Sequence, residues 1–185
     1  MNFIAKFFKA IFKKKEPKKQ YPEKIWLSEQ TTGKYAKEIT PRAIVLHDTC
    51  GNYEGSVDWT RRSHRPSGTR LYASYHCIIA RDGRRTITNL DTNRAYHAGK
   101  SKFRGKSSLN NWSIGVAFER NSHKEPIQDA AIESAIEYIL PRMEKWKIKL
   151  GNVVDHRTIS PDRKTDLKKS EFQRVKAAIK EALES

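Results

Sequence analysis

One short stretch near the C-terminus carries two side chains that bind metals. His156 opens the stretch, Asp166 closes it, and Ser160-Pro161 between them turns the chain back so that both side chains can reach one ion. A third ligand is available far upstream at His47, which ends the apolar run Ala43-Ile44-Val45-Leu46. Two imidazoles and one carboxylate leave a tetrahedral zinc ion with one position free for water. The spacing therefore suggests the hypothesis of an open zinc site.

The positions of His47 and His156 in the chain support this hypothesis only in part. Each histidine closely follows a short apolar or β-branched run, so we expect both at the ends of strands, where sites in sheet proteins are commonly built. A single histidine, however, is more often an ordinary surface or core residue than a ligand. On position alone, both interpretations stay open for each of these two residues.

The composition limits the fold and the partners. A chain of 185 residues with 37% hydrophobic residues suits one domain with one core. The 37 Lys and Arg against 21 Asp and Glu give a formal charge of +16, which favours a polyanionic partner such as nucleic acid, anionic lipid or an anionic wall polymer. Two cysteines exclude a dense disulfide framework and a four-cysteine metal site.

The first 15 residues differ in pattern from the rest of the chain. Phenylalanines and isoleucines recur there at helical spacing among lysines, which predicts a cationic amphipathic helix over residues 1–15. Three interpretations stay open: docking on the domain, contact with an anionic membrane or lipopolysaccharide layer, or nuclear or nucleic-acid targeting. Residues 16–24 are expected to form a linker and 25–185 the main domain. No apolar run approaches the ~20 residues of a membrane span, and no cleavage site of a secretory signal follows.

The remaining pattern predicts an α/β (α+β) domain, a single central mixed β-sheet flanked by helices. We expect a long loop over residues 48–70, with one helical turn near 56–62, and a helix kinked or divided at Pro141. The glycine of the strand Trp112-Ser113-Ile114-Gly115-Val116-Ala117-Phe118 suggests that other atoms approach the backbone closely. The expected strands cover 43–46, 74–80, 85–89, 112–118 and 153–154, and the expected helices begin at Pro126 and Ser170, the second burying Phe172, Val175, Ile179 and Leu183.

Several of these segments together resemble the type 2 N-acetylmuramoyl-L-alanine amidases, a family that includes phage amidase endolysins and the animal peptidoglycan recognition proteins. The resemblance covers roughly residues 40 to 168, and 156–166 is its most specific part. The other segments that carry it are Ile44-Val45-Leu46-His47, Tyr75-His76, Arg81-Asp82-Gly83, His97-Ala98-Gly99 and Asn111-Trp112-Ser113-Ile114-Gly115.

This resemblance implies a role for each candidate residue. Zinc would be held by His47, His156 and Asp166, and the substrate would be the amide that joins muramic acid to L-alanine in peptidoglycan. Lys164 matches a lysine that stabilises the negatively charged tetrahedral intermediate. Tyr75 matches a tyrosine that orients the attacking water or transfers protons, and His97 a histidine that lines the substrate groove. Without the resemblance, Lys164 is one more surface cation and Tyr75 an ordinary strand tyrosine.

The sequence departs from the family pattern at one position. Some cytoplasmic members carry a catalytic glutamate two residues after the glycine of the Ser-Ile-Gly strand, where this chain has Ala117. Glu119 lies two residues further on the same face and is kept in reserve, with proton transfer assigned to Tyr75 and Lys164. Cys50, three residues after His47, is a weaker candidate ligand because Asp166 fills the family position.

The leading hypothesis is a zinc amidase of the phage endolysin type that lyses bacterial walls. Such a monomer would be made in the host cytoplasm without a signal peptide, act on the cell wall, and contact anionic envelope layers through residues 1–15. The alternatives are a cytoplasmic amidase that recycles wall fragments and a peptidoglycan-binding module without catalysis. A nucleic-acid partner has only the charge in its favour, because no recognition motif accompanies it.

Overall fold

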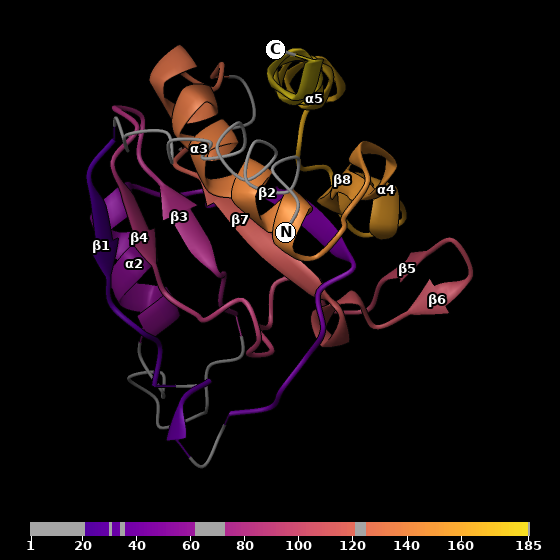
Figure 1. Cartoon of the computed structure of the whole chain (residues 1–185). Helices are drawn as coiled ribbons and strands as arrows, with labels where there is room; N and C mark the ends of the chain where they lie inside the picture. Colours follow the sequence, from indigo (N-terminus) through magenta and orange to yellow (C-terminus); the bar gives the residue numbers. More distant parts are fainter. Residues whose placement is uncertain (1–20, 30, 34–35, 62–72, 121–124, 185) are drawn as a thin grey trace, which may run out of the picture.

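The computed structural model describes residues 21–29, 31–33, 36–61, 73–120 and 125–184 (Figure 1). The helix expected over residues 1–15 lies outside these ranges, as do the first five residues of the expected linker. Statements about the structure below concern the described residues.

One six-stranded sheet organises the domain, with the strand order β1-β4-β3-β7-β2-β8 (Figure 1). Neighbouring strands run parallel except β3 and β4, which form an antiparallel hairpin. The mixed central sheet predicted from the sequence is confirmed. Its strands are β1 (Glu23–Ile25), β2 (Ala43–Asp48), β3 (Cys77–Ile79), β4 (Arg85–Ile87), β7 (Ser113–Phe118) and β8 (Val153–Asp155).

Helices flank this sheet, as expected. They are α2 (Tyr53–Arg61), α3 (Asp129–Lys145), the four-residue α4 (His156–Ile159) and α5 (Lys169–Glu184). The stretch after the segment His97-Ala98-Gly99 contains a small separate hairpin of β5 (Lys102–Phe103) and β6 (Lys106–Ser107). Short 3-10 turns cover Leu109–Asn111 and Leu150–Asn152. In the part of the chain that the structure describes, no helix combines the length and apolarity needed to span a bilayer.

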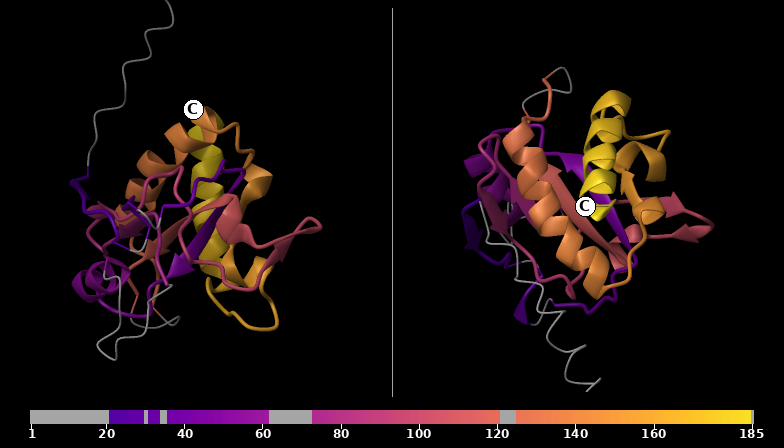
Figure 2. Two further views of the ribbon diagram at one scale, coloured as in Figure 1. Left: turned by 90° about the horizontal axis from the view of Figure 1, so that it is seen from below. Right: turned by 45° about the horizontal axis from the view of Figure 1, so that its top comes forward.

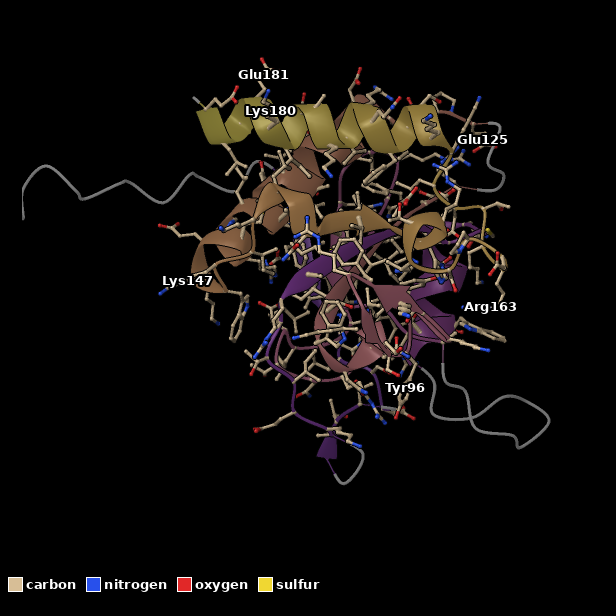
Figure 3. All side chains as sticks on the ribbon, turned by 90° about the vertical axis from the view of Figure 1, so that its right-hand side faces the viewer. Tyr96, Glu125, Lys147, Arg163, Lys180 and Glu181 are labelled. Carbon is tan, nitrogen blue, oxygen red and sulfur yellow. The ribbon has the colours of Figure 1, made fainter. Side chains whose placement is uncertain are left out.

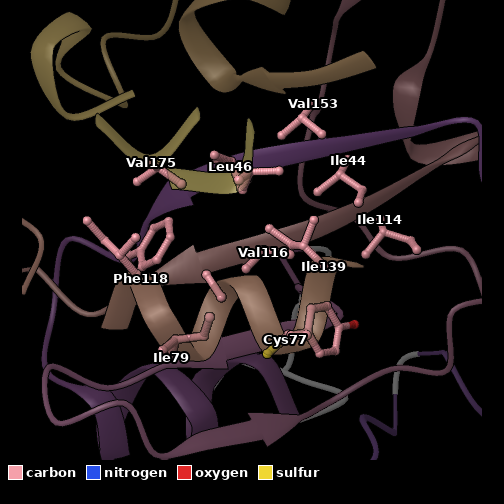
Figure 4. Packing of buried hydrophobic residues seen from close by; sticks show 14 of the residues in the cluster. Ile44, Leu46, Cys77, Ile79, Ile114, Val116, Phe118, Ile139, Val153 and Val175 are labelled. Carbon is pink, nitrogen blue, oxygen red and sulfur yellow. The ribbon is translucent and has the colours of Figure 1, made fainter. Parts of the chain in front are cut away.

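The two faces of β2 have different roles. Ile44 and Leu46 point into the main core, where Ile139 of α3 and Val175 of α5 cover the sheet (Figure 4). These two helices lie side by side over that face (Figure 2). Because side chains alternate along a strand, Val45 faces the opposite side, where it packs in a smaller cluster. His47 shares that side, away from α3 and α5.

Tertiary packing changes the expected helix boundaries at two places. Helix α3 runs without interruption through Pro141, so of the two expected outcomes, a kink or a division, the division is wrong. An interior proline costs a helix roughly 3 kcal/mol. Ile139 and Met143 on either side of it are both buried in the main core, and their burial offsets this cost. Helix α2 is longer than the expected single turn because the Tyr53 backbone N–H donates to the Glu119 carboxylate (3.1 Å) and fixes its start.

Two further differences concern the ends of the domain. Glu23 and Lys24, expected in the linker, lie in β1, which pairs parallel with β4. In α5, Val175 and Ile179 are buried and Phe172 is partly buried, as expected, but Leu183 is 50% exposed, so its predicted burial is wrong. The outward face of this helix carries Lys180 and Glu181 (Figure 3).

His76 is a buried histidine of the hairpin region. Its Nε2 lies 2.9 Å from the Asn93 carbonyl, and its Nδ1 accepts the Gly115 backbone N–H at 2.9 Å. Burial lowers the pKa of His76 from 6.5 to about 4. Between these two pH values the unfolded chain binds a proton here that the folded chain does not, so stability falls as the pH is lowered.

We therefore expect His76→Gln to reduce the slope of the unfolding free energy against pH between pH 6.5 and 4, by up to about 1.4 kcal/mol per pH unit. Urea unfolding at several pH values, with a chelator present throughout, measures the slope. The wild-type protein under the same conditions is the reference, and identical slopes would contradict a neutral, buried His76.

Candidate metal centre

Three ligand atoms of the sequence-predicted site converge in the structure. The Nδ1 atoms of His47 and His156 lie 3.0 Å apart. The Asp166 Oδ2 atom lies 3.2 Å from the Nδ1 of His156 and 3.6 Å from that of His47. Among the described residues, these three form the one group of histidine, cysteine and acidic side chains that could hold a metal ion. These are the three residues that the sequence indicates as candidate ligands.

Neighbouring strands and a closed loop bring these atoms together. His47 lies near the end of β2, and His156 follows β8, which pairs parallel with β2. Asp155 starts the short helix α4 by accepting the Thr158 backbone N–H at 2.9 Å. The Arg157 backbone N–H then donates to the Asp166 carbonyl at 2.7 Å, which closes the loop. His156 and Asp166, which stand at the two ends of this loop, consequently lie on the same side of it.

A backbone carbonyl orients His156. Its Nε2 lies 3.3 Å from the Ala98 carbonyl oxygen, which can only accept a hydrogen bond. The ring proton of neutral His156 therefore lies on Nε2, and Nδ1 turns a bare lone pair toward the cluster. The Arg163 guanidinium donates to the same Ala98 carbonyl and to the Lys100 carbonyl, both at 3.1 Å. Arg163 thus connects the loop 156–166 to the segment 98–100 through hydrogen bonds.

The pKa values of His47 and Asp166 favour the binding of a cation. Burial lowers the pKa of His47 to about 4, so this imidazole is neutral at physiological pH. Burial alone would raise the pKa of Asp166, but the neighbouring His156 and His47 hold it below its usual range, so it is a carboxylate. All three side chains are buried. A carboxylate beside two imidazole nitrogens is a favourable site for a divalent cation.

The distances between these atoms also suit a tetrahedral ion. Ligands placed at the usual ~2.0–2.1 Å from zinc are separated by about 3.3 Å, and the three separations here lie between 3.0 and 3.6 Å. Cys50 is outside the cluster, and its thiol pKa is raised, by burial first and then by Asp48 and Asp166. A protonated thiol is a poor ligand, in agreement with the low weight given to Cys50.

Tyr75 lies beside the cluster, with its ring centroid 5.3 Å from that of His47. Burial raises the pKa of its phenol, so the hydroxyl keeps its proton at neutral pH. Tyr75 also lines a cleft of about 490 Å³, whose wall includes Cys50 and the exposed Trp59. A protonated phenol at the edge of a cleft and next to a ligand can donate to a bound molecule.

Lys164 contributes a positive charge near the candidate metal centre. Its backbone N–H donates to the Ser160 carbonyl at 2.9 Å, which holds the turn before Asp166. Burial is the largest cause of the low pKa of His47, and the charge of Lys164 acts in the same direction. The same charge acts on the thiol of Cys50 and opposes the rise in its pKa. The ammonium group of Lys164 is therefore close enough to act electrostatically on both His47 and Cys50.

The profile of the N-acetylmuramoyl-L-alanine amidase family matches residues 37–169, which include all three ligands. The chain belongs to the type 2 N-acetylmuramoyl-L-alanine amidase family. It is 34% identical over 115 residues to the 1,6-anhydro-N-acetylmuramyl-L-alanine amidase AmpD of Haemophilus influenzae, a match that covers 62% of this chain and 62% of that protein. The chain thus spans less than two thirds of this relative.

Two solved structures show the fold of this amidase family. The crystal structure of a selenomethionine AmpD derivative superimposes with a TM-score of 0.68 at 21% identity, covering 83% of this chain and 93% of that one. The complex of AmiD from Escherichia coli with anhydro-N-acetylmuramic acid-L-Ala-D-gamma-Glu-L-Lys gives a TM-score of 0.63 at 25% identity, covering 78% of this chain and 59% of that one.

The position where some amidases of this family carry a glutamate is beside the metal ligand. Ala117 of β7 pairs with His47 of β2 and is fully buried. Glu119 accepts the backbone N–H groups of Tyr53 (3.1 Å) and Arg81 (3.0 Å) with its two oxygens. These contacts hold the start of α2 and the β3–β4 turn, away from the metal ligands. This arrangement leaves Tyr75 and Lys164 as the candidates for proton transfer and charge stabilisation.

The sequence did not reveal what the segment His97-Ala98-Gly99 does. His97 lies behind His47, with only 6% of its surface exposed, and burial first, then the neighbouring histidines, lower its pKa well below the usual value. Ala98 supplies the carbonyl that orients His156. Gly99 has a φ of 57°, and a Cβ there would come within 2.9 Å of the Arg163 guanidinium. The glycine at 99 was a signal for a close approach, but its partner could not be read from the sequence.

Proposed function

We propose that this protein is a zinc-dependent amidase that hydrolyses the bond between N-acetylmuramic acid and L-alanine in peptidoglycan material. The observation that carries this proposal is the convergence of His47, His156 and Asp166 within a chain of the amidase family. The three ligands leave a fourth position for a reacting molecule. A complete open site of this kind favours catalysis over the alternative of a binding module without activity.

In this reaction, different residues would bind the metal, stabilise the developing negative charge and transfer a proton. His47, His156 and Asp166 would hold zinc, which supplies a Lewis acid and lowers the pKa of water to roughly 7 when bound. Lys164 places a positive charge where the scissile carbonyl oxygen becomes negative, and stabilises the tetrahedral intermediate of the substrate. The Tyr75 hydroxyl, protonated at neutral pH, orients the attacking water and passes a proton toward the departing amine of L-alanine.

The comparisons favour released wall fragments as the substrate. The AmpD relative is by name an amidase of 1,6-anhydro-N-acetylmuramyl-L-alanine, and the AmiD structure contains an anhydromuramic tripeptide. Such fragments are the substrates of recycling rather than of wall lysis. We therefore give the recycling amidase, which the sequence offered as the alternative, preference over the endolysin.

Lysis of whole walls is the second candidate, because of the charge of the chain. A net charge of +16, with a lysine-rich amphipathic pattern over residues 1–15, suits contact with anionic membranes or lipopolysaccharide. In that case the protein would act on the wall outside the cytoplasm. We expect this segment to matter for intact envelopes and to be dispensable for soluble fragments.

Product analysis tests the proposed reaction. Zinc-loaded protein is incubated with purified peptidoglycan and, separately, with anhydromuropeptides, and the products are identified by mass spectrometry. We expect free stem peptides that begin with L-alanine, and none after treatment with a chelator. New reducing sugar ends in place of free peptides would show a glycosidase and overturn the proposal.

The same assay separates the two candidates. A recycling enzyme should have the higher kcat/KM on soluble anhydromuropeptides, and deletion of residues 1–15 should leave this value unchanged. A lytic enzyme should prefer intact peptidoglycan and lose activity on whole cells when those residues are deleted. Higher activity on intact walls than on fragments would therefore reverse our preference.

A further inference from the structure

His97 lies at the Nε2 atom of His47, whereas His156 and Asp166 lie at the Nδ1 atom of His47. The Nδ1 of His97 is 3.0 Å from the Nε2 of His47, and the Nε2 of His97 is 3.3 Å from the Ser113 carbonyl. The His97 ring lies close to Gly115 of β7, where an added Cβ would come within 2.5 Å of a ring carbon. The close approach expected at this glycine is thus made by the His97 ring.

Hydrogen bonds run in series from His47 through His97 to Ser113. The acceptor at the Ser113 end fixes the direction of each of them. The Ser113 carbonyl can only accept, and the Ser113 hydroxyl, 3.4 Å from the same nitrogen, already donates to the Leu109 carbonyl at 2.7 Å. The ring proton of a neutral His97 must therefore be on Nε2. Its Nδ1 is then bare and can only accept.

This direction determines the tautomer of His47. Because the Nδ1 of His97 accepts, the Nε2 of His47 must donate to it, and the single ring proton of His47 is used there. The Nδ1 of His47 is left bare, facing the Nδ1 of His156 and the Asp166 carboxylate. Two bare nitrogens and a carboxylate then face a common point, as a metal site requires.

We propose that His97 is a positioning residue that fixes the tautomer and ring orientation of His47 for metal binding, rather than a residue that contacts substrate. The proposal rests on the metal site of the proposed function. The two histidine ligands would then be held by different means. A backbone carbonyl orients His156, whereas the side chain of His97 orients His47, so only the second arrangement can be removed by substitution.

Two variants test this role. His97→Leu fills a similar space but leaves the Nε2 of His47 without an acceptor. In His97→Gln, the amide oxygen can accept from His47 while the amide nitrogen donates to Ser113, so the relay is retained. Zinc affinity is measured by competition with a chromophoric chelator, and the tautomer of His47 by long-range ¹H–¹⁵N NMR of the metal-free protein at neutral pH.

We expect the proton of wild-type His47 on Nε2, with zinc affinity about 10–100-fold lower in His97→Leu and largely restored in His97→Gln. The KM for muropeptide should stay within about twofold of the wild type in both variants, since uniform substrate binding is untouched.

Three results would overturn the proposal. A proton on Nδ1 of wild-type His47 would contradict the deduced tautomer. Unchanged zinc affinity with a raised KM in His97→Leu would instead assign His97 to substrate binding. Equal losses of affinity in both variants, each with the same drop in melting temperature, would show a packing role. Zinc binding does not depend on substrate, so a protein that binds zinc through this relay but hydrolyses no muropeptide would overturn only the proposed function.

Discussion

Replacement of Asp166 by asparagine is expected to reduce hydrolysis roughly a thousandfold and to remove zinc from the purified protein. The change keeps the shape of the side chain but removes the one negative charge among the three ligands, whose oxygen lies 3.2 Å from His156. A bound metal supplies several kcal/mol of transition-state stabilisation, which corresponds to about three orders of magnitude in rate. Steady-state kinetics and elemental analysis of the same preparation measure both effects.

Asp162 provides a matched control for this prediction. It lies in the same loop four residues earlier and is exposed, so Asp162→Asn changes the formal charge equally without touching the cluster. We expect wild-type zinc content and activity from this variant. Normal hydrolysis by a zinc-free Asp166→Asn protein would show that the reaction needs no metal.

Lys164→Met is expected to lower kcat by roughly 10²–10³-fold while zinc binding stays within a few fold of the wild type. Removal of one group that stabilises a developing oxyanion typically has an effect of this size. The loss should fall on kcat and kcat/KM together, because the charge of Lys164 is needed mainly after attack on the carbonyl. Single-turnover kinetics with a saturating zinc supply measure the chemical step.

Lys168→Met is the control for charge, since Lys168 is exposed two residues beyond Asp166. A second readout reports where the ammonium group of Lys164 lies. Its charge opposes the rise in the pKa of the Cys50 thiol, so Lys164→Met should raise that pKa further. The pH dependence of Cys50 alkylation measures this shift. Full kcat in Lys164→Met, with the thiol pKa unchanged, would place Lys164 outside the site.

The elements that the sequence predicted best are those with a strong local pattern. The continuous apolar run before His47 and the helical spacing of Ile132, Ile136 and Ile139 each lead to an element that the structure contains. Strand β1 has no such pattern, because its three residues are polar or exposed and it exists only through pairing with β4. The start of α2 likewise depends on Glu119, 66 positions away from Tyr53 in the chain.

The same distinction applies to the metal centre. Residue type and spacing indicated His47, His156 and Asp166 as candidate ligands, and the resemblance to the amidase family selected them. The support of those ligands was not predictable, since it consists of contacts between distant segments. The bond from His47 to His97 joins residues 50 apart, and that from His156 to the Ala98 carbonyl joins residues 58 apart.

The pairing of β2 with β8 also has a consequence for the order of folding. His47 and His156 are 109 positions apart, so the ion has no binding site until a loop of that length has closed and the edge strand β8 has joined the sheet. Closure of long loops is slow, because its entropic cost precedes the contacts that reward it. During synthesis, the chain must therefore be made almost to its last helix before it can take up metal.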